Sequence, residues 1–140
     1  MSEKIVLKYE VDGGNLNQAG EASSKMKMTL RQLGFPSDVI RRASICMYEG
    51  EINMVIHANG GTVTVEVGMD EIDITLTDVG PGIPNVERAM EEGYTTAGEV
   101  ARDLGFGAGM GLPNMKNYSD EMTVESTVGV GTTVWMKIRI

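Results

Sequence analysis

The stretch TVTVEVGMDEIDITLTDVGPG, residues 62–82, decides the fold class of this chain. The runs TVTVEVG, residues 62–68, and EIDITLTDVG, residues 71–80, are expected to form two strands. Only Met69 and Asp70 separate the two runs, so the stretch predicts a β-hairpin. The glycines and proline of GPG end the second strand.

On the N-terminal side of this hairpin, the pattern predicts one strand and two helices. KIVLKYEV, residues 4–11, alternates as a strand does. Apolar residues at three- and four-residue steps predict a helix from Asn15 to Leu33. A second helix is expected to begin with Ser37 or Asp38 as its cap and to run to about Ala58.

On the C-terminal side we expect a short helix at 86–91, a long glycine-rich segment at 93–111, a helix at 112–120 and two final strands at 121–127 and 132–140. Strands and helices in this order favour an α+β fold with helices on one face of a mainly antiparallel sheet. We find no linker or internal repeat, so residues 1–140 are expected to be one domain. The glycine-rich segment is too long to be a passive connection.

The composition of the chain narrows the class of protein. Its 140 residues are 41% hydrophobic, with a net charge of -8, which argues against direct nucleic-acid binding. No apolar run reaches the ~18 residues that a membrane span needs. The N-terminus lacks the apolar core of a signal peptide. One cysteine, Cys46, fits a reducing compartment, so we expect a cytoplasmic protein.

Three polar side chains interrupt the second predicted helix. Glu49 and Asn53 are four residues apart and therefore share one face. Taken alone, they could be an amphipathic boundary or a functional pair. Glu51 points elsewhere and is expected to be a solvated surface carboxylate. The only histidine, His57, is expected at the end of the helix, near its C-terminal dipole.

Two glycine motifs suggest a nucleotide site, although each has a simpler reading. In DVGPGI, Asp78 could accept a hydrogen bond from the exocyclic amino group of a base, with Gly80 and Gly82 admitting the flat ring; Pro81-Gly82 is also an ordinary type II turn. In GFGAGMGLPNM, glycines before a helix could bind phosphate or could form a flexible linker. The spacings match neither a P-loop nor a Rossmann fingerprint.

Together and in this order, the motifs resemble the GHKL, or Bergerat-fold, ATPase superfamily. The phrases GYTTAG, GMGLPNMK and STVGVGTTV are similar to those of bacterial anti-sigma-factor and switch serine/threonine kinases. The resemblance covers essentially the whole chain. It implies a two-layer α/β sandwich with a mixed, mainly antiparallel sheet covered on one face by helices, and a glycine-rich ATP lid.

The resemblance also implies roles for individual residues. Glu49 would be the general base of a kinase, and Asn53 would coordinate Mg²⁺ that bridges the phosphates of ATP. Asp78 would accept the adenine amino hydrogen. The other nucleotide-contacting positions would be Gly80, Gly82 and Ile83 around the base, Gly107, Gly109, Gly111 and Leu112 in the lid, and one or both of Thr132 and Thr133 on the adenine side. Arg102 lies in an inserted lid stretch and is expected to be either solvated or close to the γ-phosphate.

Three functions compete at this point. The first is a serine/threonine kinase that uses ATP and Mg²⁺ to phosphorylate a small STAS-domain, anti-anti-sigma-like regulator. The second is an ATP-gated binding module that sequesters a sigma factor or another regulator, with little catalysis. The third, a detached histidine-kinase ATPase domain, is disfavoured because no helical pair carries an acceptor histidine. The family also leads us to expect a homodimer.

Overall fold

The computed structural model describes residues 4–14, 16–83, 86, 90–91 and 111–140. Its elements, in chain order, are β1 (Ile5–Asp12), the 3₁₀ helix η1 (Leu16–Gln18), α1 (Glu21–Gln32), α2 (Ser37–His57), β2 (Gly60–Val67), β3 (Glu71–Asp78), α5 (Gly111–Tyr118), β4 (Glu121–Thr127) and β5 (Gly131–Arg139). The helix predicted at 86–91 and the glycine-rich segment before residue 111 lie largely or wholly outside the described residues.

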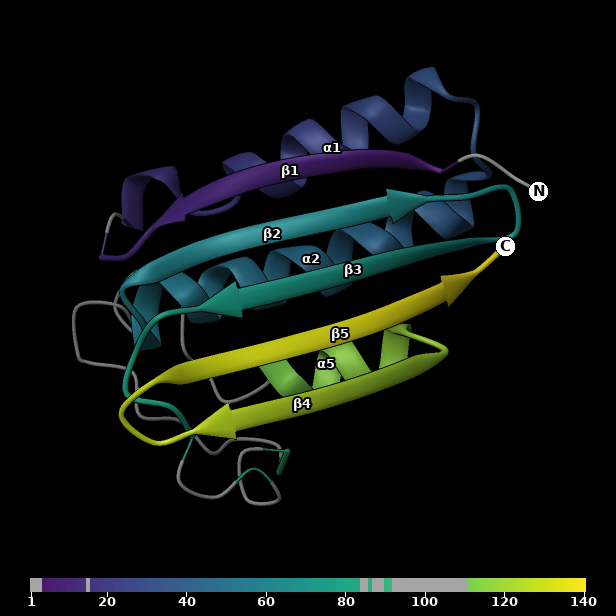
Figure 1. The fold of residues 1–140 in the computed structure, drawn as a ribbon. Helices are drawn as coiled ribbons and strands as arrows, with labels where there is room; N and C mark the ends of the chain where they lie inside the picture. Colours follow the sequence, from purple (N-terminus) through teal and green to yellow (C-terminus); the bar gives the residue numbers. More distant parts are fainter. Residues whose placement is uncertain (1–3, 15, 84–85, 87–89, 92–110) are drawn as a thin grey trace.

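The five strands form one sheet in the order β1-β2-β3-β5-β4. The predicted hairpin is β2–β3, in which Val65 pairs with Ile74. Helices α1, α2 and α5 lie on one side of the sheet and leave the other side uncovered (Figure 1). The expected α+β sandwich is therefore confirmed. Each described strand pair is antiparallel, so the parallel pairing that a mixed sheet would include is not found among them.

The core lies between the sheet and the helices. Alternate residues of the strands point into it, and methionines fill much of the remaining space, as flexible side chains suited to irregular gaps. Fully or almost fully buried members of this core are Met26, Leu30, Met47, Met54, Val63, Val65, Ile72, Ile74, Met115, Met136 and Ile138.

Helix α2 lies unusually close to β3 at Gly50. A Cβ atom added at Gly50 would lie 2.5 Å from Cδ2 of Leu76, which is too close for two carbon atoms that are not bonded. The absence of a side chain at this position therefore sets how near α2 can approach the sheet.

The start of α1 differs from the sequence prediction. The helix begins at Glu21, not at Asn15, because Gly20 adopts a left-handed conformation with φ 97° and separates α1 from η1. Gly20 is the N-cap residue and has no side chain that could accept a hydrogen bond. The first N–H groups of α1 therefore need an acceptor from another part of the chain.

That acceptor is Glu51, and its prediction as a solvated carboxylate was wrong. The residue is only 2% exposed. Its Oε2 accepts hydrogen bonds from the N–H groups of Gly20 at 2.9 Å and Ala22 at 3.2 Å. Its Oε1 accepts bonds from the N–H of Ser23 at 3.0 Å and from the Ser23 hydroxyl at 2.6 Å. A carboxylate at a helix N-terminus is also favoured by the helix dipole.

The predicted cap of α2 was also misplaced. Pro36 occupies the N-cap position, and Ser37 is already helical, with no side-chain cap hydrogen bond. Asp38 pairs instead with Arg42 one turn further along, with Nε and Oδ2 3.1 Å apart. The helix ends at His57, where the sequence placed its C-terminus, and burial lowers the pKa of this histidine.

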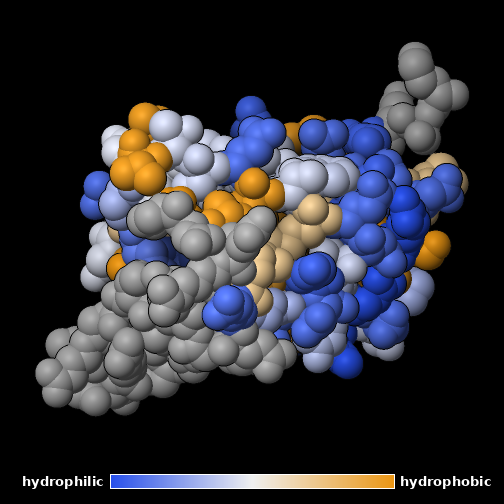
Figure 2. All heavy atoms as spheres, turned by 90° about the horizontal axis from the view of Figure 1, so that it is seen from below, coloured by the Kyte–Doolittle hydropathy of each residue, from blue (hydrophilic) through white to orange (hydrophobic). Residues whose placement is uncertain are grey.

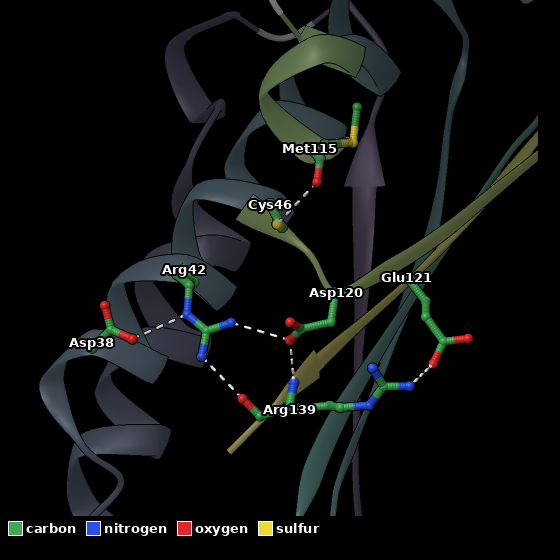
Figure 3. Close-up of polar contacts among 7 residues, drawn as sticks. All are labelled: Asp38, Arg42, Cys46, Met115, Asp120, Glu121 and Arg139. Carbon is green, nitrogen blue, oxygen red and sulfur yellow. Dashed lines mark hydrogen bonds and ion pairs between the residues drawn. The ribbon is translucent and has the colours of Figure 1, made fainter. Parts of the chain in front are cut away.

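Helix α5 and the turn after it dock on α2 through polar contacts (Figure 3). Arg42 donates to Oδ2 of Asp120 at 3.2 Å and to the carbonyl of Arg139 at 2.9 Å. Asp120 also accepts from the N–H of Arg139 at 2.6 Å, and Arg139 pairs in turn with Glu121. One turn along α2, the Cys46 thiol faces the carbonyl oxygen of Met115 at 3.7 Å. Cys46 is completely buried, which raises its pKa to about 12.

Removing the Glu51 carboxylate should destabilise the fold. In Glu51→Ala, buried N–H groups of α1 lose their acceptor, and we expect the free energy of unfolding to fall by about 2–4 kcal/mol. Urea denaturation at pH 7 measures this change. Glu10→Ala, at an exposed position on β1, is the control and should change stability by no more than about 0.5 kcal/mol. Equal stability of the two variants would contradict the capping role.

Candidate functional site

The predicted site residues approach one another around the C-terminal half of α2. Asn53 lies beside the start of α5, because a Cβ added at Gly111 would lie 3.0 Å from its Oδ1 and Nδ2. Gly80, after β3, lies against Ala58 at the end of α2, with an added Cβ 2.9 Å from the Ala58 Cβ. The N–H of Asn59 donates to the carbonyl of Val79 at 2.8 Å.

The predicted base-binding end is organised by Asp78, the last residue of β3. Its Oδ1 accepts a hydrogen bond of 2.8 Å from the N–H of Thr132 on β5. Within the part of the chain that the structure describes, its Oδ2 accepts no hydrogen bond. Burial raises the pKa of Asp78, and the bond from Thr132 acts in the opposite direction. Gly131 is required here, because an added Cβ would lie 2.3 Å from the Asp78 carbonyl oxygen.

Ser126 on β4 completes this end, although the sequence reasoning did not single it out. Its hydroxyl accepts a 2.6 Å hydrogen bond from the N–H of Ile83 and lies 2.8 Å from the Thr132 hydroxyl. It thus joins the segment after β3 to the start of β5. The sequence does contain one sign of its position, because in the alternation along β4 Ser126 falls on the same face as Met122 and Val124, which point inward.

Thr133 lies on the other face of the sheet. Thr132 and Val134 are buried toward the helices, whereas Thr133 points to the uncovered side, where it pairs with Thr77 and Glu125. Of the two threonines, Thr132 is therefore the one that the fold brings to Asp78.

The glycine turns beside Asp78 carry an apolar rim. Gly82, with φ 77°, fits closely against Thr127, where an added Cβ would lie 2.5 Å from the carbonyl oxygen. Val79, Val128 and Val130 around these turns are each about two-thirds exposed, at 64%, 65% and 65%. Seen from the β4 side, the described surface is mainly hydrophilic, with hydrophobic groups in small clusters (Figure 2).

The predicted phosphate end combines Asn53 with the start of α5. Leu112 is buried in the core and anchors this helix, while Gly107, Gly109 and Arg102 lie outside the described residues. No cluster of three or more His, Cys, Asp or Glu side chains suited to a metal occurs among the described residues. A Mg²⁺ ion here would rely on the Asn53 amide oxygen together with phosphate and water oxygens, which is a usual arrangement for this ion. Gly111 suits this position, because even a Cβ there would crowd the Asn53 amide that would bind the ion.

Glu49 lies on α2 one turn before Asn53. It is half-buried, and its Oε1 accepts a hydrogen bond of 3.4 Å from the side-chain amide of Asn114 on α5. Burial raises the pKa of Glu49, whereas the bond from Asn114 lowers it. A carboxylate with a raised pKa next to a proposed metal ligand is suited to proton transfer.

Comparison with known proteins places this arrangement in a family. Residues 41–140 match the family described as histidine kinase-, DNA gyrase B- and HSP90-like ATPases. The chain belongs to this family. Membership implies ATP binding, and the matched residues span every described element of the site.

Individual relatives of this ATPase-family protein have regulatory names. It is 34% identical to the anti-sigma F factor of Geobacillus stearothermophilus over 76% of this chain and 73% of the relative. It is 32% identical to the serine/threonine-protein kinase RsbT of Bacillus subtilis, covering 74% and 75% of the two chains. With the anti-sigma F factor of Clostridium acetobutylicum the identity is 36%, over 98% and 91%.

Neutralising Glu49 should stabilise the protein at neutral pH. Burial raises the pKa of Glu49 in the folded protein above its usual value of 4.5. At pH 7 the side chain is ionised, and its charge therefore lowers the free energy of unfolding. At low pH Glu49 is protonated in both the folded and the unfolded protein, so this cost disappears. We expect Glu49→Gln to gain about 0.5–1 kcal/mol at pH 7, as is common when functional strain is removed. The gain should vanish below about pH 4. Urea denaturation at both pH values is the measurement.

Glu125→Gln, on the exposed face of β4, is the matched control and should show no such difference. A Glu49→Gln variant that is less stable than wild type at pH 7 would show that Glu49 serves the fold rather than the site.

Proposed function

We propose that this chain is an ATP-dependent serine/threonine protein kinase of the partner-switching type. The observation that carries the proposal is that Glu49 and Asn53 share one face of α2, and the first turns of α5 contact both. Its relatives include a serine/threonine-protein kinase and anti-sigma F factors, which supports the same class. We treat residues 1–140 as one ATP-binding domain that acts in the cytoplasm.

In this proposal each site residue has one role. Asp78 accepts a hydrogen bond from the adenine amino group, with Ser126 and Thr132 holding the surrounding backbone in place. Asn53 would hold Mg²⁺, which would supply positive charge beside the phosphates. A serine or threonine hydroxyl oxygen attacks the γ-phosphorus, the bond to the β–γ bridging oxygen breaks, and Glu49 takes the hydroxyl proton as ADP leaves.

The proposed protein substrate is a small STAS-domain regulator of the same organism. No basic nucleic-acid footprint is expected at a net charge of -8. Among the described residues, no helix has the length and hydropathy needed to cross a membrane.

The kinase proposal is tested by phosphoryl transfer. Wild-type protein with labelled ATP, Mg²⁺ and the STAS-domain regulator should label that regulator on serine or threonine. Glu49→Ala should lose at least about 100-fold in rate, since a general base contributes 10²–10⁴-fold, while its affinity for ATP stays within about twofold. Asp78→Asn should instead lose ATP affinity. An unlabelled regulator would rule out the kinase function.

A second function, an ATP-gated binding module, is favoured by the names of the anti-sigma relatives. In that case ATP binding would set the affinity for a sigma factor or another regulator, with little catalysis. Partner affinities measured with ATP, with ADP and without nucleotide should then differ. Three equal affinities would exclude this alternative.

A further inference from the structure

Four contacts between α2 and the segment 111–120 follow one another in antiparallel order. Asn53 meets Gly111, Glu49 meets Asn114, Cys46 meets Met115, and Arg42 meets Asp120. The α2 members are spaced four, three and four residues apart, so they form one row along the helix. The contacts at the two ends of this row, Asn53 with Gly111 and Arg42 with Asp120, fix the position of α5 along α2. In this position Asn114 lies beside Glu49.

We propose that Asn114 is a positioning residue, whose side-chain amide holds the Glu49 carboxylate in the orientation in which it accepts the proton of the attacking hydroxyl. This inference rests on the proposed kinase function. It assigns a role to Asn114, a residue of α5 within the GMGLPNMK motif to which the resemblance gave none.

The geometry suits this role. Asn114 donates to Oε1 of Glu49 at 3.4 Å, and within the described part of the chain Oε2 accepts no hydrogen bond and stays available for a proton. A long hydrogen bond is usual for catalytic groups without substrate and tightens in the reacting complex. Both residues are half-buried, so water competes less for the carboxylate than it would at an exposed position.

The chemical type of the donor also matters. An amide orients the carboxylate without adding charge, whereas a lysine or arginine would hold the proton-accepting oxygens in a tight ion pair. Burial and, to a smaller extent, the charge of Glu49 raise the pKa values of Cys46 and Tyr48, both on α2 itself. From α5, the group facing Glu49 is the uncharged Asn114 amide.

The contact can be tested without any kinase assay. In ¹⁵N-labelled protein, the side-chain amide signals of Asn114 should shift with pH in one step that follows Glu49, and the step should disappear in Glu49→Gln. The amide of Asn117, on the same helix but exposed, should show no such step. An Asn114 amide that does not titrate would overturn the contact and the proposal.

The positioning role is tested by the variant Asn114→Ala. We expect phosphoryl transfer to the STAS-domain regulator to slow about tenfold at pH 7, a fraction of what a general base contributes, with the affinity for ATP unchanged within about twofold. Loss of the donor removes stabilisation of the charged carboxylate, so the acidic limb of the rate profile should move to higher pH. Asn117→Ala should behave as wild type.

The possible failures are distinguishable. Transfer at the wild-type rate, with an unmoved pH profile, would overturn the role of Asn114 while leaving the kinase function in place. A wild-type protein that transfers no phosphate would overturn the kinase function and with it the role in proton transfer, whereas the amide titration would still decide whether Asn114 holds Glu49.

Discussion

The close approach of α2 to the sheet at Gly50 is the constraint on which the rest of the structure depends. Glycine in a helix interior costs about 1 kcal/mol relative to alanine, yet a Cβ atom here would lie 2.5 Å from Cδ2 of Leu76, so Leu76 would have to move. The contact lets α2 lie close to β3 at this point. Since the helix is rigid over a few turns, the positions of Glu49 and Asn53 relative to Asp78 follow from it.

Gly50 is flanked by two carboxylates with different surroundings. Glu51 is buried and accepts four hydrogen bonds, so its charge is compensated and it joins α1 to α2. Glu49 is half-buried and accepts a single long hydrogen bond from another element, so its charge is only partly compensated. A compensated carboxylate stabilises a fold, whereas an incompletely compensated one retains its capacity to react. Of these two carboxylates on one helix, Glu51 therefore stabilises the fold, whereas Glu49 is suited to a role in the candidate site.

Elements with strong periodicity were predictable from the sequence, and side-chain environments were not. The hairpin β2–β3 and the extent of α2 follow from local pattern. The burial of Glu51 depends on donors 28–31 residues away, which no local pattern reveals. The late start of α1 depends on one left-handed glycine.

The same distinction holds for the site. Spacing brought out Glu49, Asn53 and Asp78, because each belongs to a motif. Ser126 and Asn114 lie within quoted motifs, but the contacts that draw attention to them are tertiary and are seen only in the folded structure. Strand alternation separates Thr132 from Thr133, but only once the register of β5 is known.

The buried thiol of Cys46 provides a built-in probe of how often α2 and α5 separate. Cys46 is the only cysteine, and it is buried in the contact between α2 and α5. Burial raises its pKa to about 12. While the two helices stay together, the thiol is therefore both shielded from alkylating reagents and protonated. Its alkylation rate in the unmodified protein therefore reports how often this pair of helices separates. A nucleotide that holds α5 against α2 would lower the alkylation rate of Cys46, and this rate can be measured without introducing a label.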